Sequence, residues 1–339
     1  MSKPKILILY SGGTIGMITD PASGTLSPFD FNHITKEIPE LKKIKCSLDA
    51  VSFKRPIDSS NMNTSSWKKM GDFIWKNFNN YHGFVILHGS DTMAYTASAL
   101  SFMFRNLNKP IIFTGSQLPI GTIRTDGKEN LITAIEIAAA TKNKEPIIQE
   151  VAIYFEYQLY RANRTTKVSS EDFEAFESFN YPTLAEAGID IKYNFQSFLP
   201  YPSEDVQYFS KFDNSIGIVY LFPGMDFDLM EKQFSLSSAK AFILMTFGSG
   251  NAPTNKKFLK IIKDFIAKGK FIVNLTQCNA GSVQQGKYET SAQLKKMGVV
   301  GAKDMTIEAV VTKLMILLAQ YNDIKDLEVA FVKSISGEI

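Results

Sequence analysis

The strongest constraint on the fold is a series of short apolar runs that alternate with helix-like segments in the first half of the chain. Runs with few polar side chains are typical of strands that are buried on both faces of a sheet. We predict strands at 6–10, 50–54, 83–87, 110–114 and 151–155, and helices at 65–79, 92–106 and 127–140. Strands separated by helices form parallel sheets covered on both faces, so this half is predicted to be an α/β domain.

A second alternation of the same kind follows a segment that has no clear period. This segment, 178–214, contains three prolines and many aromatic residues, which is typical of a connection between domains. Beyond it we predict strands at 215–221, 241–246 and 270–275, and helices at 255–267 and 305–320. The expected organisation is a larger N-terminal α/β domain at 1–190, a connection at 191–213 and a smaller C-terminal α/β domain at 214–339.

The charge balance excludes several classes of partner. The chain has 37 basic and 34 acidic residues and a net charge of +3, which does not favour a nucleic acid or a membrane surface. No apolar stretch is long enough to span a bilayer, and "YSGG" ends the first apolar run before it reaches the length of a secretory signal. We therefore expect a cytoplasmic protein.

The metal-binding residue types are few. The two cysteines, Cys46 and Cys278, are far apart in the sequence and are expected to be reduced and mostly buried thiols. The three histidines (His33, His82 and His88) are too scattered for a zinc site based on histidine. No metal and no cofactor is expected.

Hydroxyl side chains gather directly after the predicted strands. Ligands of open parallel sheets bind beyond the carboxyl ends of the strands, so these residues are candidates for a site. They are Ser11 and Thr14 after the first strand, Ser59 and Ser60 after the second, Ser90 and Thr92 after the third and Ser116 after the fourth.

The first of these loops, "YSGGTIGM", could cradle a phosphate or present the hydroxyl of Thr14. Its glycine spacing differs from G-x-G-x-x-G, and it lacks the Gly-Lys-Ser/Thr end of a Walker A loop. The glycines still permit a tight turn and a close approach of backbones. From this loop alone, a structural role and a catalytic role are equally plausible.

The third predicted strand shows the same arrangement, an apolar run followed by a glycine and a hydroxyl-bearing residue. In "FVILHGSDTM", Ser90 and Asp91 follow the glycine. If both loops leave the same sheet edge, Thr14 and Ser90 can face one small ligand. A hydroxyl nucleophile needs a base, and Asp91 or a lysine of lowered pKa could serve. "NRTTKVSSEDF" offers Lys167, which taken alone is more often an ordinary surface lysine; His88 is expected to be held by its own strand end.

These stretches together resemble the bacterial-type L-asparaginase family, and the similarity is strongest to its type I, cytoplasmic branch. The resemblance runs through most of the chain. Its motifs are "YSGGTIGM", "DSSNM", "GFVILHGSDTMAYTASALSFM", "TGSQLP", "LYRANRTTK", "FGSGNAP", "NLTQC" and "DMTIEA". Because the Gly-Gly-Thr-Ile and His-Gly-x-Asp-Thr motifs are specific as a pair, the resemblance favours Thr14 as a nucleophile.

The resemblance implies a hydrolase that converts L-asparagine to L-aspartate and ammonia, without metal or cofactor, through an acyl-enzyme on Thr14. It implies that Ser90, Asp91 and Lys167 assist proton transfer and position water, and that Asp91 also holds the substrate ammonium. The other residues that it implies for substrate binding are Asp58, Ser59, Ser60, Ser116 and Asn251, the last one reaching the active site of a neighbouring subunit. Loop amides near Ser90 and Ser116 are candidates for an oxyanion hole. It further implies a flavodoxin-like first domain and a homotetramer built from two intimate dimers.

The chain departs from the family pattern at three positions. Ser90 stands where the family usually has threonine, so the hydroxyl is kept but the methyl that restricts χ1 is lost. The loop after the nucleophile, "MITDPASGTLSPFD", has no tyrosine, and Thr25 lies near the position where many members have one. Some type I relatives bind a second asparagine beside the stretch that matches "TQC", 276–278, with the help of an arginine; the matching residue here is Met245.

Three other functions are compatible with parts of the sequence. An amidotransferase subunit that acts on tRNA shares the core but carries an extra N-terminal domain, whereas here the first strand begins close to Met1. A sensor for a small amino acid on the same fold would not require Thr14 and Lys167 together. A nucleotide-dependent enzyme is the weakest alternative, because both phosphate fingerprints fail.

Overall fold

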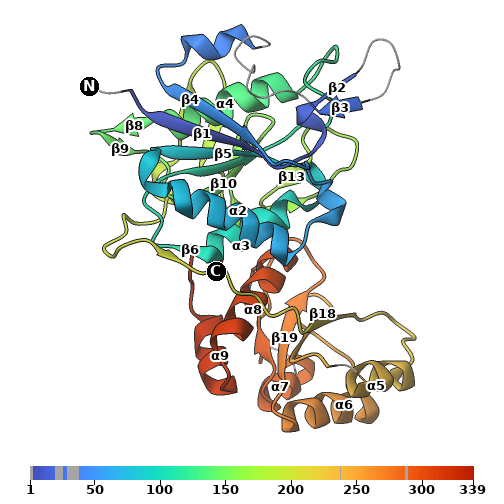
Figure 1. Cartoon of the computed structure of the whole chain (residues 1–339). Coiled ribbons are helices and arrows are strands. Elements are labelled where there is room, and N and C mark those ends of the chain that lie inside the picture. The colour runs from blue at the N-terminus through green and yellow to red at the C-terminus, as the bar shows by residue number, and fades with distance from the viewer. Residues whose placement is uncertain (1–2, 20–25, 29–37, 237, 287–288) are drawn as a thin grey trace. The chain divides into compact units, whose positions relative to one another are not determined.

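The chain forms two compact units, which comprise Met1–Ser210 and Lys211–Ile339. The computed structural model describes residues 3–19, 26–28, 38–236, 238–286 and 289–339 (Figure 1). The segment around Thr25 therefore lies outside the described residues, as does His33.

The first unit is built on a sheet with a parallel core. In chain order the core strands are β1 (Lys5–Tyr10), β4 (Ser47–Ser52), β5 (Gly83–Leu87), β7 (Ile111–Thr114) and β10 (Val151–Phe155). Their spatial order is β4-β1-β5-β7-β10, and all four pairings are parallel. This corresponds to the order 2-1-3-4-5 of flavodoxin-like sheets, so the predicted fold class is confirmed for this unit.

Three antiparallel strands extend this sheet on the β10 side. They are β11 (Gln158–Arg161), β14 (Ala185–Ala187) and β15 (Ile191–Tyr193). The segment 178–214, which we expected to connect the domains, thus contributes two of these strands and also β16 (Gln207–Tyr208), which pairs with β6 (Phe104–Arg105). Among the described residues, three further two-stranded pairs are β2 (Met17–Thr19) with β3 (Leu26–Pro28), β8 (Thr141–Lys142) with β9 (Glu145–Pro146), and β12 (Thr166–Lys167) with β13 (Phe176–Glu177).

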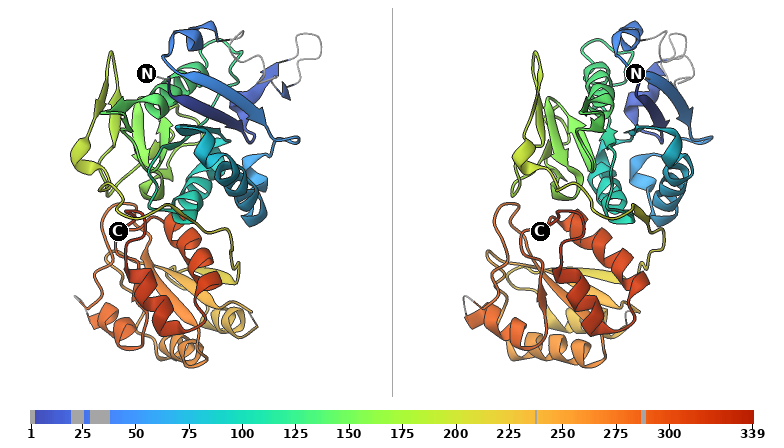
Figure 2. Two further views of the ribbon diagram at one scale, coloured as in Figure 1. Left: turned by 60° about the vertical axis from the view of Figure 1, so that its left-hand side comes forward. Right: turned by 90° about the vertical axis from the view of Figure 1, so that its left-hand side faces the viewer.

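Helices cover both faces of the parallel core (Figures 1 and 2). Helix α4 (Gly127–Ala139) packs its Ile and Leu side chains against alternate residues of the strands, among them Ile8 and Val85. The intervening strand residues, such as Leu9 and Phe84, are buried on the other face, which α2 (Thr64–Asn77) and α3 (Met93–Met103) cover. Because the period of a strand is two, burial of both sets explains why these strands are apolar throughout.

The second unit has its own parallel sheet, in the order β17-β18-β19-β20. The strands are β17 (Ile216–Tyr220), β18 (Ala241–Thr246), β19 (Phe271–Thr276) and β20 (Val300–Gly301). Its helices are α5 (Phe227–Leu236), α6 (Lys256–Ala267), α7 (Glu289–Lys296), α8 (Ile307–Gln320) and α9 (Ile324–Val332). Aromatic side chains of α5 and α6, including Phe234 and Phe265, pack against Phe242 of β18 and close the core.

Two further expectations concern the cysteines and membrane-spanning segments. Cys278 is exposed rather than buried, because it lies in the turn that follows β19, whereas Cys46 is partly buried. Within the part of the chain that the structure describes, no helix combines the length and the apolar character that a membrane span requires.

Candidate active site

The candidate site lies where strand β1 is flanked by β4 on one side and β5 on the other. This is the topological switch point of a flavodoxin-like sheet, where loops beyond the carboxyl ends of the strands leave a crevice. A short 3₁₀ turn follows each of these strands: Thr14–Gly16 after β1, Ser59–Asn61 after β4 and Ser90–Thr92 after β5. The chain order of the strands thus brings three of the predicted hydroxyl-bearing loops to one edge of the sheet.

Glycines let these loops touch through their backbones. Gly13 has a φ of 92°, and a Cβ at this position would lie only 2.4 Å from the backbone nitrogen of Gly89. A Cβ on Gly89 would in turn lie 2.6 Å from the Oγ of Ser59. Real Cβ contacts are never this close, so a side chain at either glycine would push the loops of Thr14, Ser59 and Ser90 apart.

Lys167 joins this edge from a distant part of the chain. Its Nζ donates to the Oγ of Ser90 at 2.9 Å and to the Oδ1 of Asp91 at 2.7 Å. The ammonium group is mostly shielded, with a side-chain exposure of 17%, whereas the Asp91 carboxylate is 65% exposed. Lys167 is therefore not an ordinary surface lysine: it contacts the two residues with which the motifs had grouped it.

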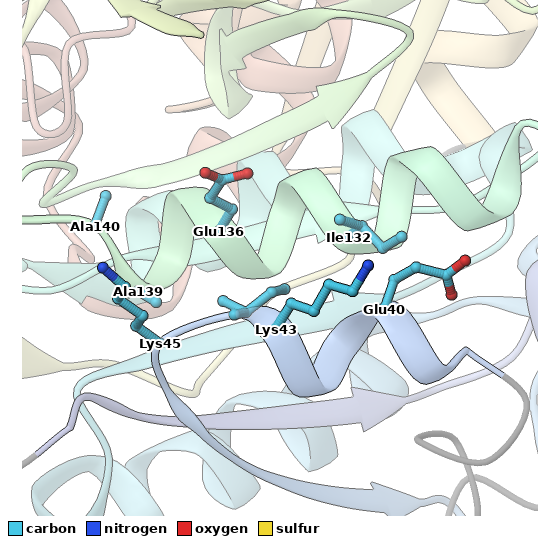
Figure 3. A pocket seen from close by; sticks show the side chains of 8 residues that line it. Glu40, Lys43, Lys45, Ile132, Glu136, Ala139 and Ala140 are labelled. Carbon is cyan, nitrogen blue, oxygen red and sulfur yellow. The ribbon is translucent and has the colours of Figure 1, made fainter. Parts of the chain in front are cut away.

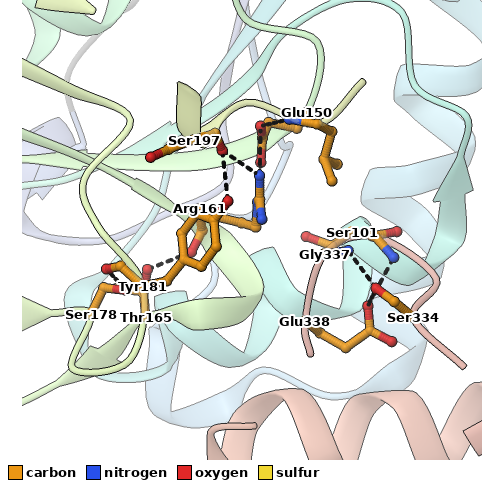
Figure 4. A network of polar contacts seen from close by, with 12 residues as sticks. Ser101, Glu150, Arg161, Thr165, Ser178, Tyr181, Ser197, Ser334, Gly337 and Glu338 are labelled. Atoms are coloured by element: carbon orange, nitrogen blue, oxygen red, sulfur yellow. Dashed lines mark hydrogen bonds and ion pairs between the residues drawn. The ribbon is translucent and has the colours of Figure 1, made fainter. Parts of the chain in front are cut away.

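A buried ion pair supports the segment that carries Lys167. Arg161, at the end of β11, donates from Nε to Glu150 at 2.5 Å and from Nη2 to the carbonyl oxygen of Ser197 at 2.8 Å (Figure 4). The guanidinium group lies over the ring of Tyr181, and the carbonyl oxygen of Arg161 accepts from Thr165, two residues before Lys167. Pairing of β12 with β13 then sets the direction in which Lys167 leaves the backbone.

We expect Arg161→Met to lower the free energy of unfolding by about 3–5 kcal/mol, because the buried Glu150 carboxylate would lose its counter-charge. Urea denaturation of the wild type and the variant measures this change. Lys68→Met is a matched control, since its ion pair with Asp72 is exposed and such pairs contribute about 0–1 kcal/mol. Equal losses in the two variants would contradict the role assigned to Arg161.

The three predicted residues of the "DSSNM" turn have two different roles: Asp58 and Ser60 hold the turn, and Ser59 packs against the neighbouring loop. Asp58 caps the turn: its Oδ1 accepts from the backbone nitrogen of Ser60 at 2.9 Å and from the Ser60 hydroxyl at 2.8 Å. The backbone hydrogen bond from Ser60 is the main cause that lowers the pKa of Asp58, so the cap is charged at neutral pH. Ser59 is buried at the Gly89 contact, and its carbonyl oxygen accepts from Thr92 at 2.7 Å.

The remaining predicted binding residues are placed differently. The hydroxyl of Ser116 donates to the carbonyl oxygen of Leu118 at 2.6 Å, and the amides of Gln117 and Leu118 donate to Asp126. These two amides are therefore occupied and are not free oxyanion donors. Asn251 belongs to the second unit, in a tight turn where its backbone amide donates to the carbonyl oxygen of Phe247 at 2.8 Å.

Tyr10 and His88 are buried titratable groups that support the loops after β1 and β5. The phenol of Tyr10 donates to the carbonyl oxygen of Gly13 at 3.0 Å, and burial raises its pKa to about 12. His88, as expected, is held at its strand end, where Nδ1 donates to the carbonyl oxygen of Gly89 at 2.7 Å; burial lowers its pKa to about 4. Both groups are neutral at pH 7, and their hydrogen bonds to the loop backbone support the shape of the loops.

Sequence reasoning missed Gln117 and Asp126. The side chain of Gln117 contacts Ser90, with 3.3 Å between Oε1 and Oγ, and Asp126 holds the backbone of Gln117 from the start of α4. Asp126 carries a weak sequence signal, since an aspartate before a helix is a common cap. Gln117 stands in the quoted "TGSQLP" motif, but a glutamine in a loop is usually solvated, so its residue type did not indicate a contact with Ser90.

A separate pocket of about 610 Å³ opens between α4 and the segment around Pro39–Lys43 (Figure 3). Its lining combines lysine and glutamate with isoleucine and alanine side chains. The lining residues are Glu40, Lys43, Ile44, Lys45, Ile132, Glu136, Ala139 and Ala140. None of these is a hydroxyl-bearing residue. The hydroxyl-bearing residues from which the motifs predict a nucleophile therefore lie at the switch point and do not line this pocket.

Comparison with known proteins agrees with the predicted family. Two family models match: "Asparaginase, N-terminal" over residues 5–198 and "Glutaminase/Asparaginase C-terminal domain" over residues 215–331. The chain is 40% identical to L-asparaginase 1 of Escherichia coli (strain K12), over 100% of this chain and 99% of that protein.

Solved structures give the same result. The crystal structure of L-asparaginase I from Vibrio cholerae superposes with a TM-score of 0.92 at 38% identity, covering 100% of this chain and 99% of that one. The thermostable L-asparaginase from Thermococcus kodakarensis has a TM-score of 0.90 at 28% identity and covers 99% of each chain. The chain therefore belongs to the asparaginase family of amide-bond hydrolases.

Proposed function

We propose that this protein hydrolyses L-asparagine to L-aspartate and ammonia, with Thr14 as the nucleophile. The observation that carries the proposal is the double contact of Lys167 with Ser90 and Asp91, beside the glycine-rich loop that presents Thr14. The names of the relatives, L-asparaginase 1 and L-asparaginase I, support the same substrate.

Substrate recognition follows from the charges of a small zwitterion. The exposed carboxylate of Asp91 suits the α-ammonium group, and the hydroxyl of Ser59 with the turn around it suits the α-carboxylate. Asp58 and Ser60 act in this proposal by holding that turn, since they bond to each other. An ammonium site and a carboxylate site on two neighbouring loops orient the side-chain amide toward the loop of Thr14.

The proposed chemistry has two steps. The Oγ of Thr14 attacks the side-chain amide carbon, the C–N bond breaks, and nitrogen leaves as ammonia with the proton that Thr14 gave up. A water molecule then attacks the acyl-enzyme, and aspartate is released as Thr14 regains a proton. Ser90, Lys167 and Asp91 form the chain of hydrogen bonds along which these protons move.

The test is the release of ammonia and aspartate from L-asparagine by the purified protein, expected in a ratio of about one to one from the reaction itself. Hydroxylamine in the same assay is expected to trap the acyl group as a hydroxamate, which reports the covalent step. Asparagine binding without ammonia release would overturn the proposal and favour a sensor for a small amino acid.

We also propose a hyperbolic dependence of rate on asparagine concentration. Met245 stands in β18 beside Leu275, where the family's effector site has an arginine, and a thioether supplies neither charge nor donor to an α-carboxylate. The carbonyl oxygen of Met245 is used internally, since Gln277 donates to it at 2.7 Å. If Met245 serves only to pack the core, the rate would depend on asparagine concentration in the same hyperbolic way. Initial rates over a wide range of asparagine concentration measure this, and a sigmoidal curve would contradict it.

We propose that the active assembly is a homotetramer of two intimate dimers, in which Asn251 completes a neighbouring site, and that the enzyme works in asparagine catabolism in the cytoplasm. Family membership supports both. Light scattering of the purified protein measures the first.

A further inference from the structure

The side chain of Gln117 contacts Ser90, and the proposed mechanism does not use it. Its Oε1 lies 3.3 Å from the Oγ of Ser90, and its Nε2 donates to the carbonyl oxygen of Asp172 at 3.0 Å. The second contact determines which end of the amide faces Ser90. With the amide reversed, its oxygen would face the Asp172 carbonyl, and two acceptors would meet.

Hydrogen bonds to Asp126 fix the backbone at Gln117. Asp126 accepts from the amide of Gln117 at 2.8 Å and from that of Leu118 at 3.1 Å, one to each carboxylate oxygen. Asn130 on α4 donates both to Asp126 and to the carbonyl oxygen of Gly115. Asp126 is buried, so these contacts exclude water and fix the position from which the Gln117 side chain reaches Ser90.

The hydroxyl of Ser90 has one proton and two lone pairs to distribute. Lys167 donates to one lone pair at 2.9 Å, and the amide oxygen of Gln117 can only accept. The Ser90 proton therefore points toward Gln117, and the second lone pair is left to accept a proton from Thr14 or from water. The distance of 3.3 Å is long for such a bond, and contacts of this kind tighten when substrate binds.

We propose that Gln117 is a positioning residue that sets the direction of the Ser90 hydroxyl proton. The inference rests on the proposed function, since it assigns a part to Ser90 in the proton transfers. The role of Gln117 matters more with serine at position 90 than with threonine. Serine lacks the methyl group that restricts χ1, so hydrogen bonds must orient its hydroxyl.

The experiment compares Gln117→Met and Gln117→Glu with the wild type. Methionine has a similar shape but accepts no strong hydrogen bond, so kcat is expected to fall roughly tenfold or more, with KM changed much less. Gln149→Met is the matched control: Gln149 also donates to a carbonyl oxygen, that of Pro146, but lies just before the amino end of β10, away from the switch point.

Gln117→Glu tests the hydrogen bond through the pH dependence of kcat, which a purely structural role of Gln117 would not change. A protonated carboxyl group reproduces the glutamine pattern, with one oxygen accepting from Ser90 and an O–H donating to Asp172, whereas the ionised group repels the Asp172 carbonyl. The charged groups around it are Lys167 and Asp91 beyond Ser90, Asp126 behind the backbone and the Asp172 side chain. The kcat of this variant relative to the wild type is therefore expected to rise as pH falls, while that of Gln117→Met stays low.

The outcomes separate this inference from the proposed function. A wild-type protein that releases no ammonia from asparagine would overturn the proposed function itself. An active wild type together with an unchanged kcat in Gln117→Met, or a pH-independent ratio for Gln117→Glu, would overturn the role of Gln117 alone. Thermal melts of both variants check that they fold: a variant with a native melt and the expected kinetics supports the proposal.

Discussion

Thr14→Ala is expected to reduce kcat for asparagine hydrolysis by at least about a thousandfold, since loss of a covalent nucleophile removes the acyl-enzyme route altogether. The fold should persist. Thr14 is half-buried in a short turn whose shape comes from its neighbours: Gly13 packs on Gly89, and the amide of Gly16 donates to the carbonyl oxygen of Gly13 at 3.3 Å. Ammonia release measures the rate, and circular dichroism checks the fold.

Thr14→Ser is the matched variant, because it keeps the hydroxyl and removes only the methyl group. It is expected to retain much more activity than Thr14→Ala and to form the hydroxamate with hydroxylamine. A folded Thr14→Ala protein with turnover near that of the wild type would remove Thr14 from the mechanism, whatever the behaviour of the serine variant.

Lys167→Met is expected to lower kcat by about a hundred- to ten-thousandfold, the usual range for removing a group that moves protons. KM is expected to change much less. Lys167 contacts Ser90 and one oxygen of Asp91, but the Asp91 carboxylate stays exposed to a substrate ammonium group. Steady-state kinetics separate the two parameters.

The chain offers a control for the loss of a lysine charge. Lys128 also forms an ion pair, with Glu40 at 2.7 Å, but both side chains are about 40% exposed and neither is part of the candidate site. Lys128→Met should therefore leave kcat unchanged. Lys167→Arg tests geometry: a guanidinium group keeps the charge but cannot give up a proton at neutral pH, so activity is not expected to return. A normal rate in Lys167→Met would make it an ordinary structural lysine.

Local patterns in the sequence predicted the parallel core well. The strands at 83–87, 151–155 and 241–246 have the predicted bounds, and the helix expected at 127–140 ends one residue earlier, at Ala139. The three strands are continuous apolar runs of five or six residues, so the burial that stabilises them is visible in the local composition.

The antiparallel strands β11, β14 and β15 were not predicted. They have three or four residues each, too few to display an alternating pattern, and they form because the edge of an existing sheet offers backbone partners. Helices α5, α7 and α9 were also missed; they are short and amphipathic, and tertiary packing stabilises such helices more than intrinsic propensity does.

The sequence by itself determined the fold class, the family and the loops that carry hydroxyl groups, because these depend on residues that are close together along the chain. Only the tertiary structure decided which of those groups meet. Lys167 lies 77 positions from Ser90 and Gln117 lies 27, and their contacts depend on how β5, β7 and β12 are placed in space. A hydrogen bond is satisfied over about 3 Å, whereas a sequence pattern describes neighbours along the chain, so a polar residue in a loop shows its role only after the core has fixed its surroundings.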